Sequence, residues 1–458
     1  MLNTCSECFA KQQKIDRLIE ENLRLKAQLH REERKASEGF FGSSTPSSKR
    51  PVKEKSLEED QNKRGGGKLG HKGHGRKKIR AEDADHIRDV EAPVGDCCPH
   101  CQGKNLTDVT TDERSVIESV PIKAEKILYR LKGKLCLDCH KVVRAKAPSV
   151  MPKALYGNQL VTNIAVMHFV HGMPMGRLEE QLQIPYSAIV EIQHRLSRLF
   201  GGVIQKLIEE YRRSPVKHAD ETGWRTDGGN GYAWLFATEN LSIFEFRDTR
   251  SGAVPASILG HERLPGTLVV DRYKGYNQSP CAMQYCYGHL LRTLQDLEKD
   301  FPDSVEVRTF VATVAPMLSL AMGLRNQPLS NATFYKQAKA LARKIQKVMK
   351  QPAQHLGIRA YQDIFIDNKA RLYAWSKDRR VPAENNLAER DLRPTVIARK
   401  VSFGSQSEAG AKTRGILMSV LVTMKKRHPE DYTERLKASL DRIAAHPTMD
   451  PYEALFPP

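Results

Sequence analysis

Apolar and polar residues recur along the chain with a period that changes several times. Between residues 158 and 200 apolar side chains return every three or four positions, which predicts helices over 160–170, 176–183 and 187–199. After residue 213 the apolar runs become short, β-branched and aromatic, and they predict strands over the following ranges: 216–219, 232–238, 241–247, 267–270 and 284–287. The pattern therefore predicts a mixed α+β chain.

The order of these elements narrows the fold. A helical segment over 254–259 separates the third predicted strand from the fourth. Three strands, a helix and a fourth strand are the order of a ribonuclease-H-like fold, in which the first and fourth strands are neighbours. Asp220 and Asp271 directly follow those two strands, so we expect the two carboxylates to meet at adjacent strand ends. The pattern over 290–375 is almost wholly that of amphipathic helix.

Two segments of different composition begin the chain. Residues 11–35 place apolar side chains and Asn22 at heptad spacing, which predicts a short parallel coiled coil, with an ordinary solvated helix as the alternative. Residues 36–85 are rich in Ser, Gly and Lys and nearly lack large apolar residues, so we expect a disordered linker. Its basic part is a candidate DNA-binding arm or a solvated spacer, and includes Lys68, Lys72, Arg76, Lys77 and Lys78.

Length and charge point to the class of partner. A chain of 458 residues exceeds one ordinary core, so we expect two to four domains. Its formal net charge of +19 favours nucleic acid, because binding of basic side chains to phosphates releases condensed counterions. We see no apolar run of bilayer-spanning length and no signal sequence, so we expect no membrane association.

Cysteine spacing predicts a structural zinc site. Two C-x-x-C pairs are separated by 34 residues and comprise Cys98, Cys101, Cys136 and Cys139. Two pairs of thiolates suit tetrahedral Zn²⁺ in a small ribbon and indicate a reducing cytoplasm, where disulfides are rare. Cys97 could replace Cys98, and unrelated free thiols are the alternative. Cys5 and Cys8 have no partner pair nearby and are assigned no metal.

Acidic residues after the strands predict a second kind of metal site. Neighbouring carboxylates repel each other unless a cation joins them, so Asp220 and Asp271 indicate a hard metal such as Mg²⁺. Glu389 is the third ligand that we choose, on a helix expected to end at Pro394. Turn caps for the aspartates, and a solvated ion pair between Glu389 and Arg393, are the structural alternatives.

Asparagines accompany the third acid. On the expected helix Asn385, Asn386 and Glu389 share one face, so two amides could flank the carboxylate and a substrate phosphate. The turn at 183–186 between the second and third helices of residues 158–200 is compatible with a helix-turn-helix unit that enters a DNA groove, although such helix pairs often only pack together.

Taken in order, these motifs resemble the DDE transposases of the insertion sequence 66 family over nearly the whole chain. Besides the coiled coil and the cysteines, the resemblance rests on short blocks: Gly70-His71-Lys72-Gly73-His74, Ala219-Asp220-Glu221-Thr222 with Trp224, Val270-Asp271-Arg272-Tyr273, Cys286-Tyr287-Gly288-His289-Leu290-Leu291-Arg292, Asn385-Asn386-Leu387-Ala388-Glu389-Arg390-Asp391-Leu392-Arg393, Arg399-Lys400 and Gly404. Two positions depart from the family pattern. Glu384 replaces an expected Asp and could compete with Glu389 as a ligand, and Tyr287-Gly288 replaces a frequent Trp-Ala before His289.

The resemblance implies a catalytic triad of Asp220, Asp271 and Glu389 holding Mg²⁺ or Mn²⁺. It implies hydrolysis that frees 3′-hydroxyls at the ends of a mobile element, followed by attack of those hydroxyls on target DNA. Further residues are expected to contact DNA, and they are His289, Arg292, Asn385, Asn386, Arg390, Arg393, Arg399 and Lys400. For His289 a helix-capping role is the alternative. The implied partners are double-stranded DNA, a second copy of the chain and small accessory proteins of the same element, in the bacterial cytoplasm at the nucleoid.

The expected fold class is multidomain α+β. The expected domains are a coiled coil over 1–35, a basic linker over 36–85, a zinc ribbon over 86–150, a helical region over 151–212, a ribonuclease-H-like catalytic domain over 213–290 and 381–425, a helical insertion over 291–380 and a C-terminal tail over 426–458. A zinc-ribbon DNA-binding regulator, a nuclease that never rejoins DNA, a structural nucleoid protein and a catalytically inactive transposase relative are the alternatives.

Overall fold

The computed structural model describes residues 124–135, 142–144 and 146–457, together with a few isolated earlier positions. The expected basic arm and the four candidate zinc ligands lie outside the described residues, as does the expected coiled coil apart from isolated positions. Among the described residues the first regular elements are the antiparallel strands β1 (Gly133–Leu135) and β2 (Val142–Arg144).

Three helices follow, as the periodicity predicts, and they are α3 (Asn158–Phe169), α4 (Met175–Leu182) and α5 (Tyr186–Phe200). They enclose a small apolar core to which each contributes, made of Ile164, Leu178, Leu182, Ile189 and Ile192. Gln183 ends α4 in the left-handed conformation, which makes the tight turn into α5. The third helix was predicted to start at residue 187, but α5 starts one residue earlier, after Pro185.

A five-stranded mixed sheet lies at the centre of the larger part of the chain, and its strands are β3 (Val216–Thr226), β4 (Gly229–Ala237), β5 (Ser242–Arg247), β6 (Thr267–Val270) and β7 (Ala282–Tyr285). Their order is β5-β4-β3-β6-β7. β3 pairs antiparallel with β4 and parallel with β6, which confirms that the first and fourth strands are neighbours. β6 and β7 are also parallel.

β3 is longer than the sequence predicts. It continues past Asp220 to Thr226 and turns into β4 through Asp227 and Gly228, which both have positive φ. This is the backbone of a two-residue hairpin turn whose twist matches that of the strands. Asp220 therefore lies within β3, whereas the sequence led us to expect it at the end of the strand.

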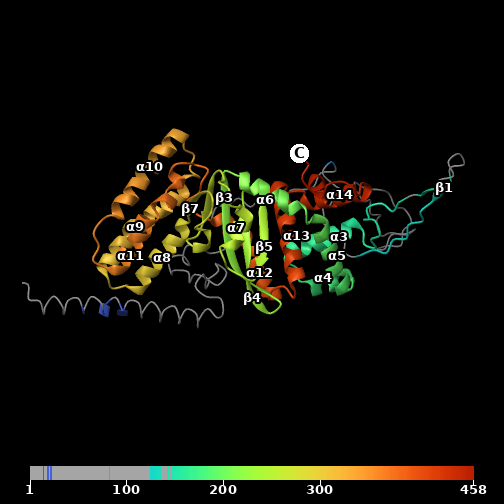
Figure 1. The fold of residues 1–458 in the computed structure, drawn as a ribbon, viewed down its shortest axis with the longest axis horizontal. Helices are drawn as coiled ribbons and strands as arrows, with labels where there is room; N and C mark the ends of the chain where they lie inside the picture. Colours follow the sequence, from blue (N-terminus) through green and yellow to red (C-terminus); the bar gives the residue numbers. More distant parts are fainter. Residues whose placement is uncertain are drawn as a thin grey trace, which may run out of the picture. The chain divides into compact units, whose positions relative to one another are not determined.

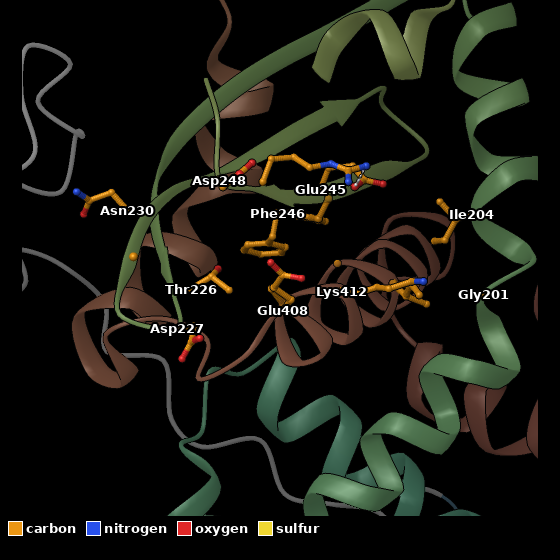
Figure 2. A pocket seen from close by; sticks show the side chains of 16 residues that line it. Gly201, Ile204, Thr226, Asp227, Asn230, Glu245, Phe246, Asp248, Glu408 and Lys412 are labelled. Carbon is orange, nitrogen blue, oxygen red and sulfur yellow. Dashed lines mark ion pairs between the residues drawn. The ribbon is translucent and has the colours of Figure 1, made fainter. Parts of the chain in front are cut away.

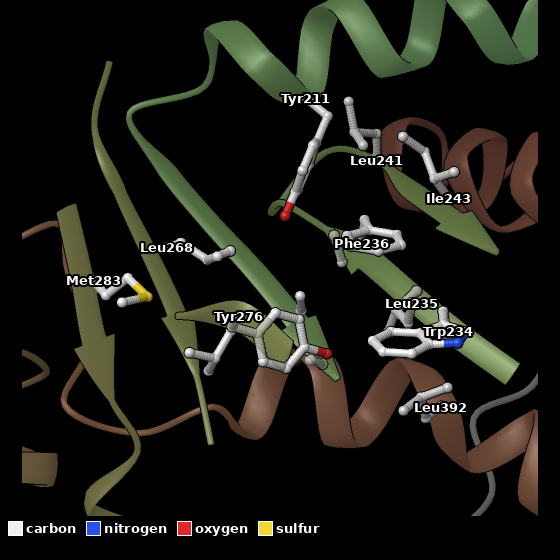
Figure 3. Close-up of a cluster of buried hydrophobic side chains, with 14 of the residues drawn as sticks. Tyr211, Trp234, Leu235, Phe236, Leu241, Ile243, Leu268, Tyr276, Met283 and Leu392 are labelled. Carbon is white, nitrogen blue, oxygen red and sulfur yellow. The ribbon is translucent and has the colours of Figure 1, made fainter. Parts of the chain in front are cut away.

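Helices cover both faces of the sheet, with α6 (Val203–Arg213) and α7 (Ala253–Leu259) on one face and α12 (Asn386–Ser402) on the other. Tyr211 of α6 packs edge-on against Phe236 and donates a hydrogen bond to the backbone carbonyl of His218. Figure 3 shows Tyr211, Phe236 and Tyr276 in this core, with Tyr276 from the short helix η3 (Lys274–Tyr276). Because neighbouring residues of a strand point to opposite faces, adjacent residues of β3 meet different helices.

α13 (Glu408–Arg427) covers the outer edge of β5. The Ser419 and Thr423 hydroxyls, one helical turn apart, accept the backbone N–H groups of Phe244 and Ser242 at 2.8 and 3.0 Å. Gly415, one turn earlier, allows this approach, because a Cβ there would lie 2.9 Å from the Phe244 carbonyl oxygen. An edge strand that would otherwise expose free N–H groups is thereby closed.

Between β7 and α12 the chain is helical, with α8 (Tyr287–Asp300), α9 (Val305–Leu324), α10 (Asn331–Val348), α11 (Leu356–Asp367), and the short helices η4 (Lys369–Arg371) and η5 (Ala374–Ser376). The chain ends with α14 (Tyr432–Ala445) and α15 (Pro451–Leu455). Within the described ranges α9 alone is long and apolar enough to span a bilayer by length and composition. The expectation that no segment reaches this length is therefore wrong, although α9 places Val307, Val314 and Leu318 in the protein core.

Candidate active site

The pairing of β3 with β6 places two aspartates opposite each other. The register pairs His218 with Val269, so two residues further along both chains Asp220 lies opposite Asp271. Neighbouring strands are about 4.8 Å apart, which brings the two carboxylates close together. Asp271 accepts the Tyr273 backbone N–H at 2.8 Å, and Asp220 accepts that of Glu221 at 2.9 Å. The parallel pairing of the two strands agrees with the predicted approach of these two acids.

Asn385 fixes the start of α12 on β3 beside Asp220. Its Nδ2 donates to the Ala219 carbonyl at 2.8 Å, and its Oδ1 lies 2.8 Å from His218 Nδ1. Its backbone N–H donates to the Cys286 Sγ at 3.2 Å. Glu389 lies one turn further along α12, so these contacts determine where its carboxylate can reach.

Electrostatics show that the acids form one cluster. Burial raises the pKa of the Asp220 carboxyl well above its usual value, and the charges of Glu221, Asp271 and Glu389 raise this pKa further. Neighbouring like charges disfavour ionisation of the Asp220 carboxyl. A bound cation would offset that penalty, so Asp220 and Asp271 are candidate ligands for a divalent metal. Among the described residues, the ligand atoms of Asp220, Asp271 and Glu389 do not all lie within 4.8 Å of one another.

Glu389 has a cationic neighbour from α8. Arg292 Nη2 lies 3.2 and 3.3 Å from the two Glu389 carboxylate oxygens. His289 Nδ1 lies 3.9 Å from Glu389 Oε1. Burial, followed by the charge of Arg292, lowers the pKa of the His289 imidazole, so this side chain is neutral at pH 7. Arg292 therefore balances the charge of Glu389. A metal ion that binds Glu389 would have to replace Arg292 as the partner of this carboxylate.

A second group of potential ligands adjoins the acids. Ligand atoms of Cys286, His289 and Glu389 lie within 4.8 Å of one another. Burial raises the pKa of the Cys286 thiol to about 12, and its Sγ accepts the Asn385 N–H. A neutral thiol is a poor ligand for a hard cation, so we assign Cys286 a structural role at the junction of α8 and α12.

Sequence reasoning missed a fourth acid with a different environment. The Glu221 side chain is only 1% exposed, and both its oxygens are engaged. Oε1 accepts from Arg250 at 2.9 and 2.6 Å, and Oε2 accepts from the Tyr276 hydroxyl at 2.6 Å. Burial, with the charge of Asp271, raises the pKa of Glu221, whereas Arg250 lowers it. An acid next to Asp220 in a strand was the available signal, but its partners are 29 and 55 residues away.

Glu384 has its own environment. Burial raises the pKa of its carboxyl, the charge of Arg325 opposes this, and within the described part of the chain no hydrogen-bond partner is found for its buried Oε2. The pKa of Asp220 is raised by the charges of Glu221, Asp271 and Glu389, and Glu384 is not among the groups that raise it.

The candidate DNA-binding residues of α12 and its N-cap divide into two groups. Asn386, Arg390, Arg393 and Lys400 are exposed. Asn385 is fully buried, and Arg399 is 7% exposed and donates to the Thr222 hydroxyl. A direct phosphate contact does not fit these two buried side chains, which instead hold α12 against β3.

The expected end of α12 also needs correction. The helix continues through Pro394 to Ser402, because a single missing N–H donor is outweighed by packing of Leu392, Val396 and Ala398. Asn385 precedes the helix as its N-cap, so it does not share a helical face with Glu389 in the way that we expected.

A cavity of about 680 Å³ lies away from the acids, between the β3–β4 hairpin, β5 and α13. Figure 2 shows Phe246, Glu245 and Lys412 at its wall. The lining includes none of Asp220, Asp271 and Glu389, so this cavity is separate from the place where the acids gather.

Acids clustered on a mixed sheet and bordered by arginines are typical of metal-dependent enzymes that act on phosphate esters. Comparison with known proteins gives the family. The model of the Transposase IS66 family matches residues 153–413, and the chain belongs to that family. It is therefore grouped with enzymes that process DNA.

Two curated relatives come from Sinorhizobium fredii (strain NBRC 101917 / NGR234). The uncharacterized protein y4qI is 23% identical over 417 residues, which cover 82% of this chain and 76% of the relative. The uncharacterized protein y4hP is 20% identical over 411 residues, covering 80% and 73% respectively.

Proposed function

We propose that this protein is a DDE transposase with a ribonuclease-H-like catalytic domain, and that Asp220, Asp271 and Glu389 hold two divalent ions. The observation that carries the proposal is the parallel register of β3 on β6, which, continued by two residues, would bring Asp220 opposite Asp271. The family match and the raised pKa of Asp220 support it. The strand order, with three antiparallel strands followed by two parallel ones, supports the ribonuclease-H-like fold.

The residues present fit Mg²⁺ or Mn²⁺, because carboxylate oxygens are the ligands that these ions prefer. Such ions, when bound, would activate an attacking oxygen and neutralise a leaving oxygen in phosphoryl transfer. Arg292 holds Glu389 until the carboxylate is needed as a ligand, and is then free to contact a phosphate. Asn385 keeps α12 in place against Ala219.

Exposed cations provide the DNA contact in this proposal. Arg390 and Arg393 project from α12 close to Glu389, where they can bind the phosphates that flank the reacting one. The basic arm, a zinc ribbon at the four cysteines and the helices α3 to α5 would hold the ends of the element. We further propose a dimer in the complex that joins two ends, and accessory proteins of the same element, in the bacterial nucleoid.

A strand-transfer assay tests the proposal. Precut duplexes made from the inverted repeats that flank the coding sequence are incubated with target DNA, Mg²⁺ and any accessory proteins. We expect joined product from the wild type and none from Asp271→Asn or Glu389→Gln, with DNA binding retained by both variants.

Two results would decide against the proposal. Joined product that survives either substitution would remove the residue from the metal site. Absence of product from the wild type, while DNA binding persists, would indicate a DNA-binding regulator or an inactive transposase relative.

A further inference from the structure

An exposed stripe on α12 continues from the acids to the end of the helix. Its exposed positions, spaced by three or four, are Asn386, Arg390, Arg393, Ile397, Lys400 and Val401, and exposed Phe403 follows. The stripe contains three cations and no acid. Its far half also carries apolar side chains, with Ile397 56% and Phe403 74% exposed. Exposed apolar side chains that stand next to one another and to cations form a contiguous patch, and such patches mark interaction sites more often than single exposed residues do.

The backbone at Phe403 is strained, which makes its exposure more informative. Phe403 ends α12 with φ +61°, in the left-handed region that a Phe rarely adopts. Strain of this kind persists only where the surrounding structure enforces it, and it gathers at functional positions.

Contacts of the next two residues enforce that conformation. A Cβ on Gly404 would lie 2.2 Å from the Arg225 carbonyl oxygen, so the chain must pass β3 closely at this point. Ser405 N–H donates to the Arg225 carbonyl at 2.9 Å, and the Ser405 carbonyl accepts the Asp227 N–H at 2.9 Å. Ser405 Oγ accepts the indole N–H of Trp224 at 3.2 Å. Hydrogen bonds to β3 and its turn therefore hold the two residues after Phe403 in place, and the Phe403 side chain points into solvent.

Charge and chemistry select the occupant. Arg390 and Arg393 on the same face suit a polyanion, and an apolar side chain flanked by cations is how proteins insert between base steps of duplex DNA. A second copy of this chain carries the same cations on this stripe, so face-to-face pairing would be repulsive.

We propose that Phe403 is a DNA wedge, which enters the groove of the bound duplex and unstacks one base step, while Ile397 and Val401 cover the adjacent sugars. This inference rests on the proposed function, because it places the same DNA along α12. Glu389 and Phe403 are separated by 14 helical residues, or about 21 Å along the axis, which corresponds to roughly six base pairs. The wedge thus acts on the flank of the scissile phosphate.

Fluorescence of 2-aminopurine tests the wedge without any catalysis. The base analogue is placed singly at each of the terminal ten positions of the precut inverted-repeat duplex, and the full chain is added in Ca²⁺. We expect a fluorescence rise at one step, about six base pairs from the scissile phosphate by the spacing above. Phe403→Leu should keep this rise, because leucine also serves as a wedge, and Phe403→Gly should abolish it.

Affinity and stability separate a DNA contact from a structural role. Phe403→Gly should bind the duplex about tenfold more weakly, as expected for the loss of one base-stacking contact. Its salt dependence should be unchanged, whereas Arg393→Gln should lower the salt slope by about one. Since glycine adopts φ +61° without strain, Phe403→Gly should unfold at a temperature at or above that of the wild type. Tyr335→Ala, which removes an exposed aromatic ring from α10, should change none of the DNA readouts.

Each contrary outcome has one meaning. Suppose that Phe403→Gly keeps the wild-type fluorescence rise and affinity while Arg393→Gln lowers the salt slope. This result would overturn the wedge and leave the proposed function standing. A Phe403→Gly protein that unfolds or changes its oligomeric state would overturn it in favour of a structural or subunit contact. Failure of the wild type to bind either the repeat duplex or a random duplex would overturn the wedge and the proposed function together.

Discussion

Two carboxylates that are adjacent in sequence have opposite environments on the two faces of β3. Asp220 faces α12, and within the described part of the chain its carboxylate accepts a hydrogen bond only from the Glu221 backbone. Glu221 lies on the opposite face, where Arg250 of the loop between β5 and α7 and Tyr276 of η3 engage both its oxygens. Arg250 also lies over the Tyr273 ring, 4.2 Å from its centroid. Burial raises the pKa of both acids, but Glu221 alone has a cation and a hydroxyl as compensation.

The comparison shows how one strand supports both a reactive and a structural acid. A half-buried carboxylate to which the described residues offer no side-chain hydrogen bond is costly as an anion, and a bound cation would remove that cost. A carboxylate that is already satisfied gains little from a metal. We therefore interpret Asp220 as a ligand, and Glu221 as the anchor that fixes β3 against η3 and the loop before α7.

Substitution of Asp220 should have the largest effect. Asp220→Asn should lower strand transfer by about a thousandfold or more, because metal ions contribute several kcal/mol to stabilising such transition states. The same variant should be more stable than the wild type at neutral pH without metal. A raised carboxyl pKa gives stability that is present below the usual value of 3.8 and is lost as pH rises through the folded value. Product yield and thermal unfolding in EDTA measure both effects, and loss of stability in the variant would contradict this interpretation of Asp220.

Acid should destabilise the protein through two buried histidines. Burial lowers the pKa of His168 and of His218 from 6.5 to about 4. A histidine whose folded pKa is depressed gives stability that is present above pH 6.5 and is lost as pH falls toward 4, up to about 3 kcal/mol for each residue. Urea unfolding between pH 7 and 4 checks this, with His218→Asn expected to reduce the slope. An unchanged slope in that variant would show that His218 ionises freely in the folded state.

Substitution of Glu221 should affect stability more than chemistry. Glu221→Gln should cost about 2 kcal/mol of unfolding free energy, because Arg250 loses its counter-charge in a partly buried site. Activity per folded molecule should fall much less than in Asp220→Asn. Urea unfolding gives the first quantity and strand transfer the second. A double-mutant cycle with Arg250→Gln isolates the pair, and additive effects of the two substitutions would exclude the proposed coupling.

The smallest effect is expected at Asn385, which holds Glu389 in place without touching DNA. Asn385→Ala should lower strand transfer by about 10- to 100-fold, the range seen when residues that orient metal ligands are removed. DNA affinity should be unchanged. Asn386→Ala, at the exposed neighbouring position, is the matched control and should reduce affinity instead. Weaker DNA binding in Asn385→Ala would favour the direct contact that the sequence suggested.

The sequence predicted what depends on local pattern. Strand order and the approach of Asp220 to Asp271 followed from short β-branched runs and the helix between them. The predicted end of β3 was wrong, because the strand continues beyond Asp220 to a hairpin turn at Asp227 and Gly228. The end of α12 was wrong, because packing against β3 carries that helix past Pro394.

Features made by distant partners could not be predicted. The burial of Asn385 depends on Ala219, 166 residues away, and the engagement of Glu221 depends on Arg250 and Tyr276. Exposure of Phe403 follows from the contact between Gly404 and Arg225, which no periodicity reveals.

The central claim is that Asp220, and not Glu221, binds the metal that supports strand transfer. Replacement of each by Cys tests it most directly, because a thiolate is a poor ligand for Mg²⁺ and tolerates the softer Mn²⁺ better. Strand transfer by Asp220→Cys and Glu221→Cys is measured in Mg²⁺ and in Mn²⁺. We expect Asp220→Cys to be inactive in Mg²⁺ and to regain product in Mn²⁺, with no metal-dependent rescue of Glu221→Cys. The account would be contradicted if Asp220→Cys folds and binds DNA but stays inactive in Mn²⁺. It would also be contradicted if Mn²⁺ rescues Glu221→Cys and does not rescue Asp220→Cys.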